Sequence, residues 1–249
     1  MRLVKWERLP PEMQTEEVRK YYDILKKKRL GLFFKRLFDI VVSLTLLLIL
    51  SPLFLILAIA IKIDSKGPVF FRQERITQYG KKFRIFKFRS MVQDAPKMGS
   101  EVTVKNDMRI TRMGKLIRKC RLDEISQLID VLRGKMTFVG TRPEVEKYVK
   151  AYTPEMMATL LLPAGITSES SILYKDEDEL LNASTDVDKT YVEDVLPGKM
   201  YYNLKSIEKF SFFRDIRTMF RTVFAMLDKN YEGDYKKEEQ TVEKEADND

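Results

Sequence analysis

The sequence contains no histidine and only one cysteine, Cys120, among its 249 residues. Without histidine there is no Ser-His-Asp triad, no histidine-activated thiol and no zinc site of the HExxH kind. A single cysteine excludes an internal disulfide and any metal cluster built from several cysteines. Chemistry in this chain must therefore rely on carboxylates, lysine, arginine, hydroxyl groups or a hard cation.

Signatures of export and of nucleic-acid binding are missing too. The first residues are too charged for a signal peptide, and no cleavage site follows them. No RNP1, KH or helix-turn-helix pattern is present, although the net charge is +8 and the pI is about 9.3. For so basic a chain we expect anionic lipids and phosphorylated substrates as partners, and no nucleic acid.

The two ends of the chain differ in charge. Residues 229–249 are acidic, polar and almost free of aliphatic side chains, which predicts a disordered tail. Residues 1–38 carry aromatic and aliphatic side chains around the basic run KKKR at 26–29, with a helix expected over 15–37. This mixture favours an interfacial amphipathic segment over an ordinary solvated helix.

An apolar run fills residues 39–64, and its roughly twenty uncharged residues match the length of a membrane helix. Pro52 lies near its middle, where the missing N–H and the ring clash predict a kink, and Ser51 favours the same bend. Cations flank both ends: Lys35 and Arg36 before the run, and Lys62, Lys66, Arg72 and Arg75 after it. A simple span has excess cations only on its cytoplasmic side, so a helix that enters, bends and returns is favoured over a kinked span.

The segment 67–91, GPVFFRQERITQYGKKFRIFKFRSM, predicts a small β-hairpin, because apolar and basic residues alternate around the turn sequence TQYGKK. Its cations next to a membrane segment favour anionic lipid or substrate phosphate over single-stranded nucleic acid. Two helices are expected further along, at 110–133 and 211–227. The second has either an interfacial or a core-facing role.

Two adjacent carboxylates, Asp123 and Glu124, follow several cations in the 110–133 segment. In one interpretation they begin a helix, where the dipole stabilises negative charge. In the other they perform phosphoryl transfer, in which one carboxylate attacks phosphorus and the second holds Mg²⁺. Attack of an anion on an anion needs the metal and nearby cations, and Arg112 and Arg118 are candidates to contact the phosphates.

Six ordered blocks resemble the bacterial sugar transferase family, the monotopic phosphoglycosyl transferases. They are KRLFDIVVS leading to Ser51-Pro52, GPVFFRQER, KFRSM, NDMRITRMGKLIRKCRLDE, QLIDVLRGKMTFVGTRPE and RDIRTMF. The resemblance implies an α+β monotopic protein with a re-entrant helix broken at Ser51-Pro52, interfacial helices and a small β-hairpin. It also implies the cytoplasmic face of the bacterial inner membrane as the location.

The resemblance implies a reaction as well. A UDP-sugar and undecaprenyl phosphate give undecaprenyl-diphospho-sugar and UMP, as the first membrane step of glycoconjugate synthesis. Asp123 is expected to carry a covalent phosphosugar, and Glu124 to hold Mg²⁺. The matching positions for substrate phosphate or nucleotide are Lys87, Arg89, Arg142 and Asp215.

Three positions depart from the family pattern. Ser126 and Thr141 stand where LDELPQ and GPRP have proline, and Pro163 stands where an arginine is expected. The departure at Pro163 implies that a phosphate or nucleotide contact is lost or is supplied by another residue.

Four segments are therefore expected: an amphipathic N-terminal segment (1–38), a re-entrant helix (39–64), a cytosolic catalytic domain with interfacial helices (65–228) and an acidic tail (229–249). Two other functions fit the same features. A non-catalytic membrane adaptor would use the basic face only to bind anionic lipid, and would still work with asparagine at position 123. A nucleotide-sugar hydrolase would turn over without lipid.

Overall fold

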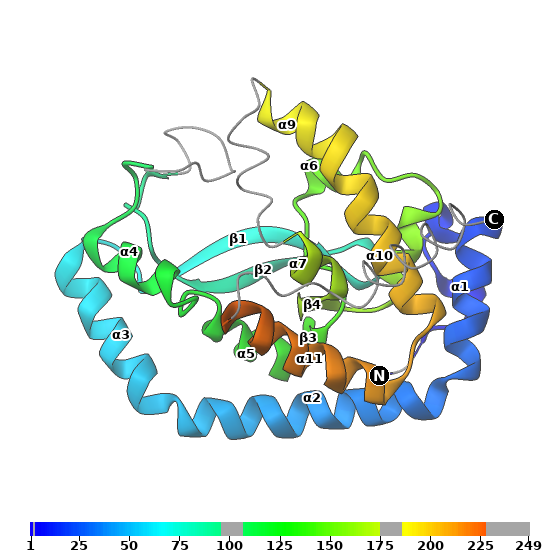
Figure 1. Cartoon of the computed structure of the whole chain (residues 1–249), viewed down its shortest axis with the longest axis horizontal. Coiled ribbons are helices and arrows are strands. Elements are labelled where there is room, and N and C mark those ends of the chain that lie inside the picture. Colours follow the sequence, from blue (N-terminus) through cyan, green and yellow to red (C-terminus); the bar gives the residue numbers. More distant parts are fainter. Residues whose placement is uncertain (2, 96–106, 175–185, 228–249) are drawn as a thin grey trace, which may run out of the picture.

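The computed structural model describes every residue except 2, 96–106, 175–185 and 228–249, so the expected acidic tail lies outside the described residues. Its mixture of helices with two small sheets confirms the α+β class (Figure 1). The described helices of four residues or more are α1 (Glu16–Lys27), α2 (Arg29–Ile49), α3 (Ser51–Asp64), α4 (Arg112–Lys119), α5 (Leu128–Leu132), α6 (Glu146–Val149), α7 (Glu169–Leu173), α9 (Val187–Thr190), α10 (Leu196–Glu208) and α11 (Phe212–Leu227), with a π-helix at Tyr191–Val195 and a 3-10 helix at Met156–Leu161.

The expected β-hairpin is present. Strands β1 (Phe70–Thr77) and β2 (Lys81–Phe88) pair antiparallel, with Phe70 opposite Phe88. Tyr79 and Gly80 in the turn have positive φ angles of 59° and 69°, which reverses the chain tightly. The prediction of strands from alternating residues around TQYGKK is therefore confirmed.

A second sheet was not expected from the sequence. Strands β3 (Met136–Val139) and β4 (Ala164–Thr167) pair in parallel, and both lie over α2 and α11 (Figure 1). Gly140 and Gly165 pack backbone against backbone, because a Cβ on Gly165 would come within 2.3 Å of the Gly140 backbone. Because neither glycine has a side chain, the chain can cross β4 directly after β3. Arg142 lies in the segment that follows this crossing.

Helices α2 and α3 form the bent element expected from Pro52. Among the described residues no single helix is long and apolar enough to cross a bilayer, whereas α2 and α3 together are, with a 61° bend between them. The break falls at Leu50, directly before Ser51 and Pro52. The position of the bend is confirmed, and α2 runs without interruption across the expected boundary at residues 38 and 39.

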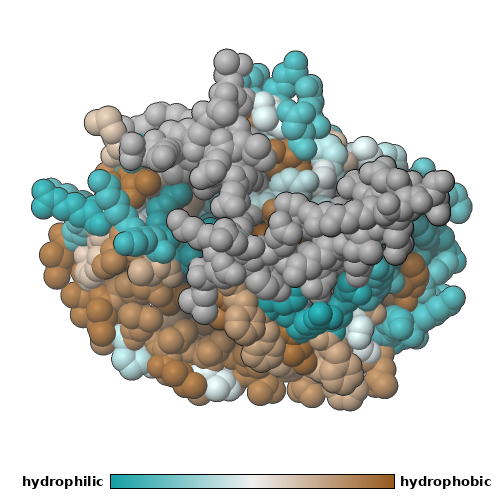
Figure 2. Space-filling model, viewed as in Figure 1, coloured by the Kyte–Doolittle hydropathy of each residue, from teal (hydrophilic) through white to brown (hydrophobic). Residues whose placement is uncertain are grey.

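A continuous hydrophobic surface covers the side of the molecule on which α2 and α3 lie (Figure 2). Helix α11 adds to it, which confirms that the 211–227 segment is an amphipathic helix. The exposed apolar side chains on these three helices include Phe33, Phe34, Leu37, Val41, Leu44, Leu48, Ile49, Leu55, Ile56, Ile59, Ile63, Phe213, Phe220, Val223 and Phe224. The opposite face of α11 is in the interior, where Arg221 pairs with buried Glu169 at 2.8 Å.

The N-terminal segment is divided into two helices, which the sequence did not predict. The expected helix over 15–37 breaks at Lys28 into α1 and α2. The apolar face of α1, with Val18, Tyr21 and Leu25, is buried against the Met156–Leu161 helix and α10. Apolar burial against protein explains the aromatic residues of α1. Phe33 and Phe34 of the same expected segment lie on α2 and are exposed, so the interfacial role of the segment stays a prediction.

Candidate active site

A reversal of the chain precedes the two carboxylates. We expected one helix over 110–133, but α4 stops at Lys119 and Arg121 adopts a left-handed φ of 55°. The amide of Leu122 donates to the carbonyl of Ile117, five residues earlier, at 2.9 Å. A second bond runs from the amide of Arg121 to a carbonyl three residues earlier, at 3.0 Å. These bonds form a Schellman motif, which ends a helix, so the expectation of one continuous helix is wrong.

Asp123 follows the reversal, and its backbone is bound to strand β2. The amide of Phe88 donates to the carbonyl of Asp123 at 3.0 Å. The hydroxyl of Ser126 lies 3.3 Å from the same carbonyl and 3.1 Å from the carbonyl of Phe86. Ser126 is fully buried. The serine that stands where the family has proline therefore ties the acidic turn to the strand.

Asp130 is a residue that the sequence analysis missed. Its carboxylate accepts a hydrogen bond from the amide of Phe86 at 2.7 Å, and the side chain is buried. The backbone of Phe86 is thus held on both sides, by Asp130 at its amide and by Ser126 at its carbonyl. This fixes the position of the next residue, Lys87. The sequence carries little signal for this role, because Asp130 lies off the apolar stripe of the predicted helix, on the same side as Asp123.

Glu124 forms the centre of the charged cluster. Its Oε1 lies 3.1 Å from Nζ of Lys87 and 3.0 Å from Nη2 of Arg142. Both hydrogen bonds fall on Oε1, and Oε2 accepts none from the described residues. Glu124 begins the 3-10 helix Ile125–Gln127, but its side chain makes no capping bond there. Its carboxylate serves the cluster with Lys87 and Arg142, which lie far away in sequence, rather than the helix.

The two carboxylates differ in their electrostatic surroundings. Burial would raise the pKa of Glu124, but the cations of Arg142 and Lys87 hold this pKa well below its usual range. Burial raises the pKa of Asp123 above its usual value, and the charge of Glu124 adds to this, while Lys87 and Arg118 oppose it. Burial also lowers the pKa of Lys87. One carboxylate is thus firmly ionised, while its neighbour is more basic than a free aspartate.

The carboxylates of Asp123 and Glu124 fit Mg²⁺ that is also bound by a substrate. They do not fit a metal ion that is bound by protein side chains alone. Within the described residues no three carboxylate, histidine or cysteine side chains gather around one point. Mg²⁺ is commonly held by one or two carboxylates together with substrate phosphates. Asp123 and Glu124 supply two adjacent carboxylates, and Oε2 of Glu124 is available among the described contacts.

Arg89, expected to contact phosphate, lies elsewhere. Its guanidinium donates to the carbonyls of Lys66 and Ser65, both at 2.7 Å, and the side chain is only 4% exposed. These carbonyls follow the C-terminal end of α3, where a cation is stabilised by the helix dipole. Arg89 therefore anchors α3 to the hairpin, and the structure does not bring it to Glu124.

The expected cations of α4 lie on two different sides. Arg118 is half-buried and acts on Asp123, whose pKa it helps to lower. Arg112 is exposed and acts instead on Asp64, at the end of α3. Of these two candidates, only Arg118 belongs to the electrostatic surroundings of the acidic pair.

Asp215 forms a separate cluster beneath β3. Its Oδ2 lies 2.5 Å from Nζ of Lys35, which also donates to the carbonyl of Val139 at 2.7 Å. Nearby Asp39 accepts hydrogen bonds from the hydroxyl of Thr137 and the amide of the next residue. Lys35 is only 3% exposed, so it is not the exposed flanking cation that we expected.

Arg36 also forms hydrogen bonds within the protein. Its guanidinium donates to the carbonyls of Val131 and Leu132, at 2.7 and 2.9 Å. These carbonyls belong to the last turn of α5, so Arg36 ties α5 to α2. The basic flank before the apolar run is therefore made by the exposed lysines and Arg29 at 26–29, not by Lys35 and Arg36.

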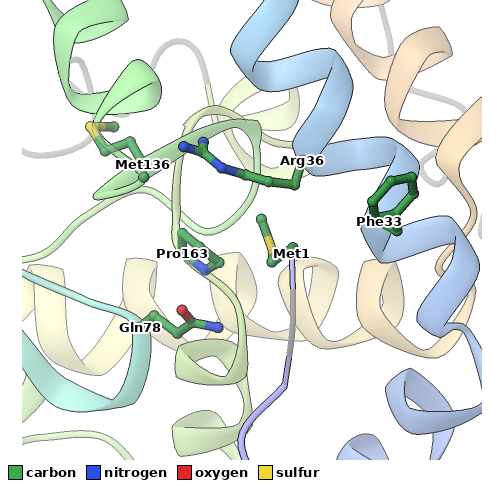
Figure 3. Close-up of a pocket in the computed structure, with 7 residues that line it drawn as sticks. Met1, Phe33, Arg36, Gln78, Met136 and Pro163 are labelled. Carbon is green, nitrogen blue, oxygen red and sulfur yellow. The ribbon is translucent and has the colours of Figure 1, made fainter.

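Pro163, where the resemblance implies an arginine, faces a different hollow. It lines a pocket of about 410 Å³ that also contains Phe33, Arg36, Gln78 and Met136 (Figure 3). None of the residues around Glu124 lines this pocket. The structure thus places position 163 in the same pocket as Arg36, away from the acidic pair.

Comparison with known proteins agrees with these observations. Residues 30–229 match the family model described as bacterial sugar transferase. The chain is 34% identical over 198 residues to the UDP-N-acetylgalactosamine-undecaprenyl-phosphate N-acetylgalactosaminephosphotransferase of Aeromonas hydrophila, a match that covers 78% of this chain and 44% of that protein.

Two proteins named UDP-glucose:undecaprenyl-phosphate glucose-1-phosphate transferase are also similar. The one from Klebsiella pneumoniae is 35% identical over 200 residues, which cover 78% of this chain and 40% of the relative. The one from Caulobacter vibrioides is 32% identical over 198 residues, 78% of this chain and 69% of the relative. The chain thus matches less than half the length of the first two relatives. On the evidence of the matched region and the site, this chain belongs to the bacterial sugar transferase family.

Proposed function

We propose that this protein transfers a sugar-1-phosphate from a UDP-sugar to undecaprenyl phosphate, giving undecaprenyl-diphospho-sugar and UMP. The observation that carries the proposal is the pairing of Asp123 with Glu124 beside Lys87 and Arg142. The names of the similar proteins supply the substrate classes. This reaction is the first membrane step in the synthesis of a glycoconjugate.

Asp123 is the nucleophile in this proposal. Its carboxylate oxygen attacks the phosphorus that bears the sugar, a bond from oxygen to phosphorus forms, and the bond to UMP breaks. An oxygen of the lipid phosphate then attacks the same phosphorus, and the bond to Asp123 breaks, which restores the carboxylate. Burial supports this role, because a poorly solvated carboxylate with a raised pKa is a stronger nucleophile.

The other residues of the site offset the negative charge of the carboxylates and of the substrate phosphates. Glu124 would hold Mg²⁺, which would supply the positive charge that an anion needs to approach another anion. Lys87 and Arg142 keep Glu124 ionised and oriented, and they are the cations that would neutralise substrate phosphate oxygens bound beside Glu124. Arg118 adds positive charge near Asp123.

The same proposal places the protein at the cytoplasmic face of the bacterial membrane. The 61° bend between α2 and α3 and the hydrophobic surface on these helices and α11 support a re-entrant helix that both enters and leaves on one side. Leu122 and Ile125, on either side of the acidic pair, pack in one cluster with Leu57 and Ile61 of α3. Insertion of α3 would therefore bring the pair close to a lipid acceptor. The membrane would then supply the second substrate directly at the protein surface.

A panel of UDP-sugars tested with undecaprenyl phosphate and Mg²⁺ tests this function. The purified protein should release UMP and form a diphospho-linked lipid with at least one sugar, and Asp123→Asn should abolish both. Asp94→Asn, an exposed carboxylate outside the site, is the matched control and should remain active. A wild-type protein that binds the vesicles without turnover would support an adaptor, and UMP release that ignores the lipid would support a hydrolase.

A further inference from the structure

A buried polar cluster lies behind Arg142. The hydroxyl of Tyr191 donates to Oε1 of Glu144 at 2.6 Å, and Nζ of Lys199 donates to the same hydroxyl at 3.2 Å. Nζ of Lys199 is 3.9 Å from Oε1 of Glu144, so the tyrosine bridges the two charges. The side chains of Glu144 and Lys199 are 7% and 4% exposed, and Tyr191 is 5% exposed.

Short connections join this cluster to the active site. Glu144 is separated from Arg142 by a single proline, Pro143. The carbonyl of Glu144 accepts from the amide of Ile76 at 2.9 Å, and the carbonyl of Pro143 accepts from Arg75 at 3.3 Å. The segment is thus fixed to β1 by its backbone and to the cluster by a side chain. Arg142 extends from the fixed segment to Glu124.

The helices that supply the cluster come from a distant part of the chain. Tyr191 begins the π-helix Tyr191–Val195, a rare element often found at functional sites, and Lys199 lies in the first turn of α10. Tyr148 of α6 packs on the ring of Tyr191, with centroids 4.5 Å apart. Apolar side chains could fill such a core at least as stably as a buried ion pair, so the charges point to a role in geometry.

We propose that Tyr191 and Lys199 are positioning residues that hold Glu144 and, through it, hold Arg142 against Glu124. The inference deepens the proposed function, on which it rests, because it assigns the 187–208 segment a part in forming the donor phosphate site. Nζ of Lys199 and Oε1 of Glu144 are 3.9 Å apart, which is too far for a hydrogen bond. The tyrosine hydroxyl is therefore needed to connect them. Without this hydroxyl the hydrogen-bonded link from Glu144 to the 187–208 segment is lost, and Arg142 samples more positions.

A double-mutant cycle between Tyr191→Phe and Arg142→Lys tests the connection. The quantities are kcat/KM for the UDP-sugar and the dissociation constant for UDP, which remains measurable when turnover is slow. With Arg142 present, Tyr191→Phe should lower kcat/KM roughly tenfold, as expected for one hydrogen bond to a charged group. In the Arg142→Lys background the same change should cost less than about twofold, because coupled residues are not additive.

Tyr148→Phe is the matched control. It also removes a tyrosine hydroxyl from this small core, but that hydroxyl donates to Asp188. It should leave kcat/KM and UDP binding unchanged, and melting temperatures should be recorded for all variants. If Tyr191→Phe does not fold, Lys199→Met replaces it in the cycle, with the same expected coupling.

Additive effects in the cycle, or an equal loss in Tyr148→Phe, would overturn the positioning role and leave the proposed function intact. A wild-type protein that releases no UMP from any UDP-sugar would instead overturn the proposed function, and the positioning role with it. The two failures are therefore distinguishable in one set of measurements.

Discussion

The hydroxyl of Ser51 donates to the carbonyl oxygen of Leu48 at 2.8 Å, the carbonyl that would accept from residue 52 in a regular helix, where Pro52 has no N–H. Regular bonds resume on both sides, from Leu50 to Leu46 at 2.8 Å and from Phe54 to Leu50 at 2.9 Å. At the break between α2 and α3 the Ser51 hydroxyl therefore satisfies a carbonyl that the proline cannot. Such compensation is needed wherever a bent helix enters lipid.

Pro52→Ala should straighten the bent pair, because it restores an N–H and removes the ring clash. Single cysteines near Arg29 and near Lys66, introduced with Cys120→Ser, report the topology through labelling in sealed vesicles. With Pro52 present, both positions should be labelled from the same side. With Pro52→Ala, the straightened helix is long enough to span, and the two positions should become accessible from opposite sides.

Ser51→Ala is the control for this experiment. It removes only the hydroxyl bond to Leu48 and keeps the proline, so both positions should still be labelled from one side. Opposite-side labelling in the wild-type protein would contradict the re-entrant arrangement. Same-side labelling in Pro52→Ala would show that the proline does not set the turn.

The pH dependence of UMP release should follow Asp123. Its reactive form is the carboxylate, and burial raises its pKa, so activity is present above that pKa and lost as the pH falls through it. Lys87 lowers this pKa, and Lys87→Met should therefore shift the acidic limb of the pH–rate profile to higher pH. Lys26→Met, on the exposed surface of α1, should not. Identical acidic limbs in wild type and Lys87→Met would rule out this electrostatic coupling.

Glu124→Gln should lower the rate of UMP release by roughly 10- to 100-fold, the usual range for loss of a group that supports a metal. The amide keeps the shape of the side chain but loses the negative charge that pairs with Lys87 and Arg142. The Mg²⁺ concentration for half-maximal rate should rise. Full wild-type activity in excess EDTA would show that no metal role exists for Glu124.

Arg121→Gly should stabilise the fold by about 1 kcal/mol, because a side chain in the left-handed region is strained and glycine is not. Thermal or denaturant unfolding in detergent measures the change. Lys119→Gly, two residues earlier at the last helical position of α4, should instead destabilise by about 1 kcal/mol. A loss of stability in Arg121→Gly would mean that the arginine side chain contributes more than its strained backbone costs.

Local patterns allowed the hairpin, the bend at Pro52 and the α11 helix to be predicted from the sequence. Each depends on neighbours in the chain: alternating residues with a turn, a proline, and apolar residues three and four apart. The ending of α4 was missed because no glycine marks the left-handed residue, and Arg121 carries no sign of it. Strands β3 and β4 were missed because four residues are too few for a periodic pattern.

For the candidate site, the sequence analysis identified Asp123, Glu124, Lys87 and Arg142, but not what holds them. Arg89 follows the last residue of β2, so strand alternation no longer decides where its side chain points, and it turns under α3. The cluster of Glu144 and Tyr191 joins residues 47 positions apart in the sequence. Such contacts depend on packing, which no local pattern encodes.

The central claim is that Asp123 carries the sugar phosphate, and trapping the adduct tests it most directly. Protein incubated with a UDP-sugar and Mg²⁺, without undecaprenyl phosphate, should release about one UMP per active site in a burst. Its mass should increase by one sugar phosphate, located in the peptide that contains LDEISQ. Asp123→Asn should show neither burst nor adduct. UMP release that appears only with undecaprenyl phosphate present, with no trapped adduct, would contradict the account.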